Sequence, residues 1–297
     1  MSGAAEIKTR INSISETKKV TDAMYMISSV KMRKARREIE KTTPFFIAIR
    51  EEIGELLHYM PENTDRYFKN QDVEGIVGRA LLLITSDKGL SGSYNHIAIK
   101  KAEEQLNAHD DMILFNVGEY GWNYFSGKKY RMAEDFRDSA SFPTIWKAKQ
   151  ITNELLRYYD NDIVDDIDII YTHYMAGIPE ECKNRCLLPL DKSEFYDSND
   201  FELPFGKEYY PSPEKVFDGI VPSLITGFIY SALVDSYCSE QDARMSAMKT
   251  AGDNAEDILK NLKIEYNGIR QAAITREMTE LASGGKALRK KRLTNGQ

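Results

Sequence analysis

The sequence predicts an α/β protein in which a long antiparallel two-helix coiled coil, formed by the N- and C-termini, joins a central Rossmann-like α/β sheet domain. Neither Gly nor Pro occurs from Ala4 to Thr43, and no Pro follows Pro222, so both chain ends can form long helices. Between them, short apolar runs rich in β-branched and aromatic residues alternate with helical patterns, as is typical of an α/β sheet.

The N-terminal segment, residues 1–60, is expected to be the first helix of the coiled coil. Its apolar side chains recur at mostly helical intervals among charges, at Ile7, Ile11, Ile14, Met24, Ile27 and Val30. Pro44 predicts a kink or a break, after which the pattern from Phe45 to Tyr59 is again helical. At about 1.5 Å per residue, such a helix is a rod and cannot fold into a globule by itself.

The middle of the chain, residues 75–195, is expected to be the sheet domain. Strands are predicted at Arg79–Ser86, Met112–Val117, Asp166–Met175 and Asn184–Leu190. Helical patterns alternate with them at Asn95–Asn107, Glu119–Ser126 and Ile145–Tyr159. Residues 196–213, which contain many turn-forming residues, are expected to be a linker.

The C-terminal segment, residues 214–297, is expected to be the second long helix, ending in a basic tail. Three- and four-residue steps connect its apolar side chains, among them Met245, Met248, Ala255, Leu262 and Ile269. The uncharged stretch Gly219–Val234 falls short of the roughly 20 apolar residues that a membrane span needs, so it is expected to be a buried helix. Two helices with one apolar stripe each bury these stripes best by packing against each other in antiparallel orientation.

The apolar stripe of the predicted coiled coil is interrupted by polar and small residues. Lys18 and Thr21 fall where the first stripe should continue, and Gly252 and Gly268 lie in the second, where glycine costs about 1 kcal/mol relative to alanine. Such a pair of helices is poorly stabilised alone. The pattern therefore predicts either a solvated bridge or enclosure by another protein.

Composition and charge narrow the functional class. Apolar residues make up 42% and charged residues 29%, and the net charge is −6, although residues 1–43 carry ten Lys and Arg against five acids. Three cysteines predict no disulfide framework and favour a reducing, cytosolic compartment. Cys182 and Cys186 share one predicted strand and one face of it, but two thiols make a weak metal site, so both are expected to be structural.

Two features leave other functions open. The turn between Gly89 and Gly92 could present backbone N–H groups to a phosphate, yet its spacing matches neither the Walker loop nor the dinucleotide fingerprint. The five cations of Lys31–Arg37 could contact nucleic acid, although the whole chain is acidic and acids follow directly. A nucleotide-binding α/β enzyme using the Gly89–Gly92 turn stays as the alternative, and no nucleic-acid partner is expected.

No set of side chains predicts catalysis. The histidines never share a helical i, i+4 step, and the serines lack the context of a nucleophile elbow. We therefore expect no catalytic, cofactor-binding or metal-binding residues in this chain.

Three segments, found in the right order along the whole chain, closely resemble the bacterial gamma subunit of the F-type ATP synthase, the central rotor shaft. They are IKTRINSISETKKVTDAMYMISSVKMRKA at residues 7–35, ITSDKGLSGSYN at 84–95, and SEQDARMSAMKTAGDNAEDILKNLKIEYNGIRQAAITREMTEL at 239–281. The resemblance implies a non-catalytic subunit that couples ion-driven rotation of the c-ring to ATP synthesis or hydrolysis at the beta subunits. It also implies that the sheet domain does not bind nucleotide.

The resemblance implies partners and a location as well. The antiparallel helices would lie inside a ring of alternating alpha and beta subunits, and the sheet domain, with the epsilon subunit, would rest on the c-ring of the membrane sector. The chain itself would not span the membrane and would be peripheral, at the cytoplasmic face of the cell membrane. Because the shaft is asymmetric, each beta subunit would meet a different face and be biased towards a different nucleotide affinity.

Individual residues match motifs of this family. Arg270, Gln271 and Thr275 match the catch, which hydrogen-bonds an acidic-ended loop of one beta subunit. Met24 matches a methionine near the beta lever loop, and Arg244 matches the family arginine in ARM. These five positions are therefore expected to contact beta subunits.

Other positions extend or depart from the resemblance. Tyr209 and Tyr210 resemble the stretch nearest the c-ring and epsilon subunit. Asp22 stands where the family usually has Lys, and Arg276 replaces a frequent Gln, which alters the charge expected against the beta lever. The tail Lys286–Gln297 adds five cations beyond the usual end. No regulatory dithiol insert is visible, so redox control is not expected.

Overall fold

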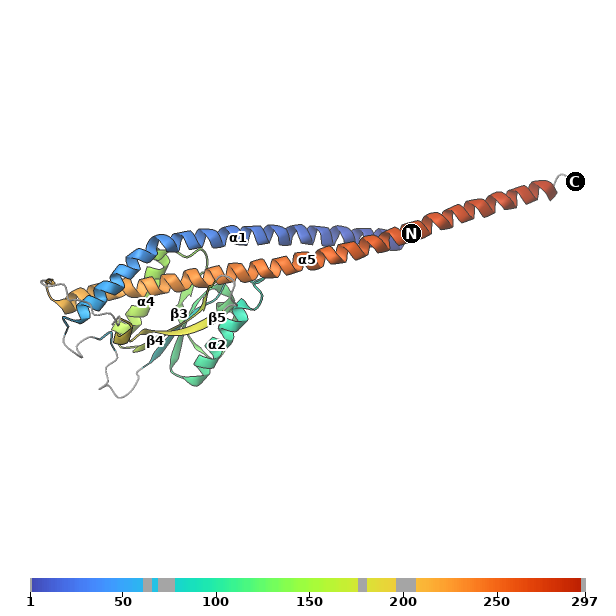
Figure 1. The fold of residues 1–297 in the computed structure, drawn as a ribbon. Helices are drawn as coiled ribbons and strands as arrows, with labels where there is room; N and C mark the ends of the chain where they lie inside the picture. Colours follow the sequence, from blue (N-terminus) through green and yellow to red (C-terminus); the bar gives the residue numbers. More distant parts are fainter. Residues whose placement is uncertain (1, 61–65, 69–77, 176–180, 196–206, 295–297) are drawn as a thin grey trace. The chain divides into compact units, whose positions relative to one another are not determined.

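The computed structural model describes residues 2–60, 66–68, 78–175, 181–195 and 207–294. The chain forms two compact units. Unit 1 comprises residues 1–26 and 246–297, and unit 2 comprises residues 27–245. Two long helices, α1 (Ser2–Leu57) and α5 (Pro213–Thr294), each contribute to both units (Figure 1). Residues 196–206 of the predicted linker lie outside the described residues.

Unit 2 is built on a five-stranded sheet with the order β3-β2-β1-β4-β5. The strands are β1 (Arg79–Ile84), β2 (Met112–Val117), β3 (Arg131–Asp138), β4 (Asp166–His173) and β5 (Glu181–Leu188). The first four are parallel, and β5 runs antiparallel to β4. The shorter helices are α2 (Tyr94–Ala108), α3 (Glu119–Phe125) and α4 (Ile145–Asp160), and a 3₁₀ turn, η1, covers Lys192–Glu194. The predicted α/β class is confirmed.

Apolar clusters cover both faces of this sheet, because alternate residues of a strand point to opposite sides. On one face, Leu82 and Phe115 pack with buried residues of α1, α4 and α5. On the other face, Leu81 and Leu114 pack with α2 and with Phe125 of α3. The parallel strands are therefore buried on both sides, which explains why RALLLI and MILFNV read as nearly continuous apolar runs.

Helix α1 does not end at Pro44. The helix is continuous from Ser2 to Leu57 with Pro44 inside it, so there is no break there, and the ribbon bends in its later part, as the predicted kink would allow (Figure 1). A proline inside a helix removes one backbone hydrogen bond. The helix continues because Ile53 and Leu56, in the segment after Pro44, are completely buried in the core of unit 2.

The start of α5 belongs to the core of unit 2. One stretch within Pro213–Lys286 is long and apolar enough to cross a membrane by length and composition, and 56% of this 18-residue window is buried inside the protein. Val221, Ile225 and Ile229 are among its buried side chains. Their burial agrees with the prediction that Gly219–Val234 is a buried helix.

In unit 1, the beginning of α1 runs antiparallel to α5 (Figure 1). Lys18 Nζ lies 2.7 Å from Glu256 Oε2, and a Cβ on Gly252 would lie 3.4 Å from Asp22 Oδ1. A Cβ at Gly252 would make only ordinary van der Waals contacts, so the two distances define which residues of α1 and α5 face each other rather than a need for glycine. Thr21 is buried and donates its hydroxyl hydrogen bond to the carbonyl oxygen of Lys18.

Candidate interaction surfaces

The C-terminal surface, residues 270–286 of α5, is exposed at every position. Among the described residues, none forms a hydrogen bond or an ion pair with the side chains of Arg270 and Gln271, and Thr275 is exposed beside them. Ile274, Met278 and Leu281 add an exposed apolar stripe at helical spacing. An apolar stripe flanked by polar donors is typical of a surface that binds another protein.

The stripe on the C-terminal surface follows from the register of unit 1. Lys18 faces Glu256 and Asp22 lies beside Gly252, so Ser2, where α1 begins, lies opposite about residue 272 of α5. Beyond that point, α1 supplies no partner for the apolar side chains. The polar residues of this surface were predicted from the sequence, but its apolar stripe was not. The three- and four-residue spacing of Ile274, Met278 and Leu281 does indicate such a stripe.

Met24 lies in unit 1 and is half-buried. Its neighbours Val20 and Met26 are more exposed, and Met26 keeps 70% of its surface. This part of α1 therefore offers apolar contact area around Met24 itself. Asp22, one of the two departures from the family pattern, is exposed on the same segment.

The side chain of Arg244 forms an ion pair and hydrogen bonds within unit 2. Its side chain is 9% exposed, and its Nη2 atom lies 2.6 Å from Glu240 Oε1. The same atom donates hydrogen bonds to the carbonyl oxygens of Lys88 and Gly89 at 3.2 and 3.1 Å. Burial raises the pKa of Glu240, and the Arg244 guanidinium opposes that shift. In this structure the Arg244 guanidinium is held within unit 2, and its contact with a beta subunit stays a prediction.

Arg244 belongs to a row of polar residues on α5, here called the α5 seam: Asp235, Ser236, Ser239, Glu240 and Arg244. The backbone N–H of Thr172 donates to Ser236 Oγ at 3.1 Å, and Ser239 Oγ donates to the Thr172 carbonyl oxygen at 3.4 Å. His173 Nδ1 lies 2.6 Å from Asp235 Oδ2. The sequence reasoning missed this seam, although polar residues at helical spacing within a buried helix were a signal for it.

The α5 seam fills the crevice in which an α/β fold of this kind would hold a nucleotide. In open parallel sheets, ligands bind at the carboxyl ends of strands where the strand order reverses, here between β1 and β4. A cavity of about 10 Å³ lies there, lined in part by Thr85, Tyr94 and Glu240. A phosphate does not fit into it, and two carbonyl oxygens of the turn face Arg244. The nucleotide-binding alternative is therefore not favoured.

The turn that receives Arg244 is held by its own hydrogen bonds. Gly92 has a φ of 56°, which suits glycine and lets the chain enter α2 after a tight turn. Asn95 Oδ1 accepts a hydrogen bond from the backbone N–H of Ser86 at 3.0 Å. Asp87 Oδ1 accepts another from the N–H of Ala140 at 2.7 Å. These hydrogen bonds therefore tie the glycine-bearing turn to α2 through Asn95 and to the segment after β3 through Ala140.

Tyr209 and Tyr210 have different environments. Tyr210 keeps 93% of its surface exposed, whereas Tyr209 is half-buried, with its ring 5.4 Å from that of Tyr59. Nearby, Lys207 Nζ lies 2.9 Å from Glu52 Oε2. Tyr209 is thus tied to the end of α1, and Tyr210 is the side chain of the two that is open to a partner.

Two cations of the basic cluster Lys31–Arg37 make contacts with aromatic rings within unit 2. Lys34 Nζ lies 4.7 Å from the centre of the Phe142 ring, and the Arg36 guanidinium lies 5.8 Å from that of Tyr174. Both cations therefore pack against aromatic rings of the sheet unit.

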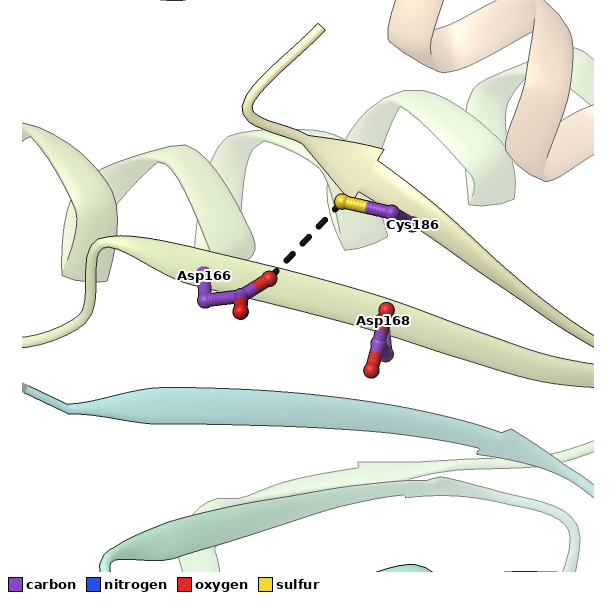
Figure 2. Close-up of side chains that lie close together, drawn as sticks. All are labelled: Asp166, Asp168 and Cys186. Carbon is purple, nitrogen blue, oxygen red and sulfur yellow. Dashed lines mark hydrogen bonds between the residues drawn. The ribbon is translucent and has the colours of Figure 1, made fainter. Parts of the chain in front are cut away.

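A cluster of two carboxylates and one thiol lies where β4 and β5 pair (Figure 2). The ligand atoms of Asp166, Asp168 and Cys186 lie within 4.8 Å of one another, and Cys186 Sγ is 3.7 Å from Asp166 Oδ1. Burial, followed by the nearby Asp166 charge, raises the pKa of Asp168. Arg79 Nε lies 3.8 Å from Asp166 Oδ2, so a protein cation already balances part of this charge. Cys182, which lies on β5 like Cys186, is buried.

Comparison with known proteins agrees with this architecture. The chain matches the family model for ATP synthase over residues 3–288. It is 37% identical over 290 residues to the ATP synthase gamma chain of Acetivibrio thermocellus, with 96% of this chain and 98% of that one covered. It is 31% identical over 299 residues to the sodium ion specific ATP synthase gamma chain of Acetobacterium woodii, with 95% and 98% covered.

Solved structures share the fold. A chain in the central stalk/c-ring structure of the Tetrahymena thermophila mitochondrial ATP synthase matches with a TM-score of 0.59 and 24% identity, covering 78% of this chain and 99% of that one. A chain in the OSCP/F1/c-ring structure of the Euglena gracilis mitochondrial ATP synthase matches with a TM-score of 0.62 and 15% identity, covering 96% and 95%. The family model and the curated relatives cover nearly the whole chain. The chain therefore belongs to the ATP synthase gamma chain family.

Proposed function

We propose that this chain is the central-stalk rotor subunit of an ATP synthase. In this role it couples ion-driven rotation of the c-ring to ATP synthesis or hydrolysis at the beta subunits, and it catalyses neither reaction itself. The observation that supports this best is the C-terminal surface, which no other described part of the chain covers. A helix with an exposed apolar stripe and unused polar donors needs an enclosing partner.

The partners follow from this role. A ring of alpha and beta subunits encloses unit 1, and the sheet of unit 2 rests with the epsilon subunit on the c-ring. The 93% exposed side chain of Tyr210 supports a contact on the c-ring and epsilon side. The complex is membrane-associated, and we place the chain at the cytoplasmic face of the cell membrane.

The exposed donors of the C-terminal surface suit a catch. Arg270 and Gln271 are consecutive on the helix and offer an exposed guanidinium and an exposed amide, and Thr275 lies one helical turn after Gln271, on the same face. Hydrogen bonds from an arginine to a carboxylate are charge-assisted and directional. We assign these residues to an acidic-ended loop of one beta subunit and Met24 to the beta lever loop. The apolar contacts are few, so neighbouring angular states differ by only a few kcal/mol, consistent with typical coupling energies.

The rotor role is tested by reconstitution. The purified chain alone is expected neither to bind nor to hydrolyse ATP, as followed by calorimetry and phosphate release. Its addition to purified alpha and beta subunits is expected to stimulate ATP hydrolysis. A mixture whose hydrolysis does not respond to the chain would overturn the proposal.

The catch is tested by replacing Arg270 and Gln271 together with Ala in the assembled enzyme. Loss of a charge-assisted hydrogen bond at the contact is expected to lower coupled ATP synthesis by about tenfold. The matched control replaces Lys260 and Asn261, an adjacent cation and amide that are also exposed on α5. Equal effects of the two double variants on ATP synthesis in membrane vesicles would argue against a specific catch.

A further inference from the structure

The α5 seam gathers several directional contacts on a helix that is otherwise held in unit 2 mainly by apolar packing, with one further buried hydrogen bond from Thr226 Oγ1 to Thr152 Oγ1. Most of the buried side chains of α5 in unit 2 are apolar, from Phe217 to Cys238. Apolar burial is non-directional, so it resists separation of the helix from the sheet more than rotation of the helix about its own axis. Hydrogen bonds and ion pairs depend on angle and therefore resist that rotation.

The seam reaches two strand ends at once. Asp235, Ser236 and Ser239 hold residues at the end of β4, whereas Arg244 holds the turn that follows β1. Since β1 and β4 are neighbours in the sheet, α5 is fixed at two points across its path. A helix fixed at two separate points cannot turn without breaking contacts at both of them.

Arg244 is the last member of the seam and lies two residues before Ser246, where unit 1 begins on α5. Its charge is enclosed: Glu240 balances it, and the carbonyl oxygens of Lys88 and Gly89 accept its hydrogen bonds. The turn that supplies those oxygens is itself tied to α2 through Asn95. The contact is thus rigid on both sides at the point where α5 leaves the sheet unit.

We propose that Arg244 is a positioning residue that locks α5 against rotation at the β1–α2 turn, so that torque on the sheet unit is passed into the shaft helix. This inference rests on the proposed rotor function and deepens it. These contacts occupy the crevice that other α/β folds use for nucleotides. The glycine-bearing turn binds the guanidinium of Arg244 there instead.

The lock predicts a specific defect. If α5 slips in the sheet unit, hydrolysis at the beta subunits still turns the helix, but less of that rotation reaches the c-ring. The ratio of ions transported to ATP hydrolysed then falls. A residue that only stabilised the fold would lower both rates together, because it would lower the amount of assembled enzyme and leave the ratio unchanged.

The experiment measures this ratio in inverted membrane vesicles that contain the complete ATP synthase with this chain. Ion transport is followed with a pH-sensitive dye and with radioactive sodium, and hydrolysis by phosphate release. Arg244→Gln is expected to lower the ratio by about tenfold, the effect of one lost charge-assisted hydrogen bond on a two-state equilibrium. Arg244→Lys keeps the charge and a donor, so it is expected to restore part of the ratio.

Lys100→Gln is the matched control, because it removes an exposed cation of α2 that lies in the sheet unit but outside the seam, and its ratio should equal that of the unaltered enzyme. An unaltered ratio in assembled Arg244→Gln enzyme would overturn the lock and leave the rotor function standing. Failure of the unaltered chain to support transport would overturn the rotor function itself. Where Arg244→Gln does not assemble, Arg244→Lys decides: a reduced ratio supports the lock and an unaltered one overturns it.

Discussion

Three cysteines of this chain have contrasting surroundings. Cys238 and Cys182 are buried on opposite faces of the sheet, and burial raises the pKa of their thiols to about 12 and about 11. Cys186 is exposed on β5. Since the thiolate is the reactive form, burial makes the first two chemically inert as well as inaccessible.

The thiols should therefore react in order of exposure. At pH 8, iodoacetamide is expected to modify Cys186 first. The higher pKa of Cys182 reduces its thiolate by about a hundredfold relative to an unperturbed thiol. Mass spectrometry of timed samples measures this order. Modification of Cys238 at the rate of Cys186 in native protein would contradict the burial, and urea-unfolded protein provides the equal-rate control.

The same burial makes stability depend on alkaline pH. The pKa of Cys238 rises from 9.0 to about 12, so the folded state keeps a proton that the unfolded state has lost above pH 9. Its stabilisation is complete below pH 9 and is lost as pH rises towards 12. The free energy of unfolding should fall by about 1.4 kcal/mol per pH unit for this group in that range. Urea unfolding at pH 9, 10 and 11 measures the slope, which Cys238→Ala should reduce.

At the scale of elements, two glycines of α5 differ in whether their position has room for a side chain. A Cβ on Gly227 would collide with the ring of Phe46 from α1, whereas a Cβ on Gly219 would meet nothing within 4 Å. Gly227 is therefore needed for the close approach of α1 and α5 in unit 2. Gly219 only lowers the helix propensity of its segment.

These two positions form a matched pair of substitutions. Gly227→Ala is expected to destabilise unit 2 by about 1–3 kcal/mol, because the extra carbon overpacks a filled contact. Gly219→Ala is expected to stabilise the helix by up to about 1 kcal/mol. Urea unfolding followed by the fluorescence of Trp122 and Trp146 compares them. Stabilisation by both substitutions would show that Phe46 moves aside freely.

Most elements of the sheet unit could be predicted from the sequence because strands buried on both faces are apolar throughout. Strand β3 (RMAEDFRD) was missed, since it lies at the sheet edge and has few apolar residues. The choice between a kink and a break at Pro44 could not be made from the sequence, because it depends on the tertiary burial of Ile53 and Leu56, which outweighs the lost hydrogen bond. The partner of Arg244 is a turn 155 residues away, and one sequence contains no signal for such a pairing.

For the whole molecule, the unequal lengths of the two long helices matter most. In unit 1, α1 lies beside α5 up to about residue 272, whereas the rest of the C-terminal surface continues without it. The sequence indicated helices too poorly packed to stand alone. It could not give the register, which is seen only in the contact of Lys18 with Glu256 and in the position of Asp22 beside Gly252.

The C-terminal surface should be the least stable part of the isolated chain. Limited trypsin digestion is expected to cut first at Arg270, Arg276 and Lys286, because a helix without tertiary contacts opens locally at little free-energy cost. The sheet unit should survive as a large fragment in gel and mass analysis. Addition of alpha and beta subunits is expected to protect these sites, and unchanged cleavage in the complex would contradict enclosure of this surface.

An uncovered apolar stripe on Ile274, Met278 and Leu281 also bears on how a cell must handle this polypeptide. Copies made in excess of their ring subunits have no means of hiding those side chains, and they become substrates for proteases and for self-association. Synthesis of the chain in step with its ring subunits, and prompt removal of orphaned copies, are therefore consequences of the length by which α5 outruns α1.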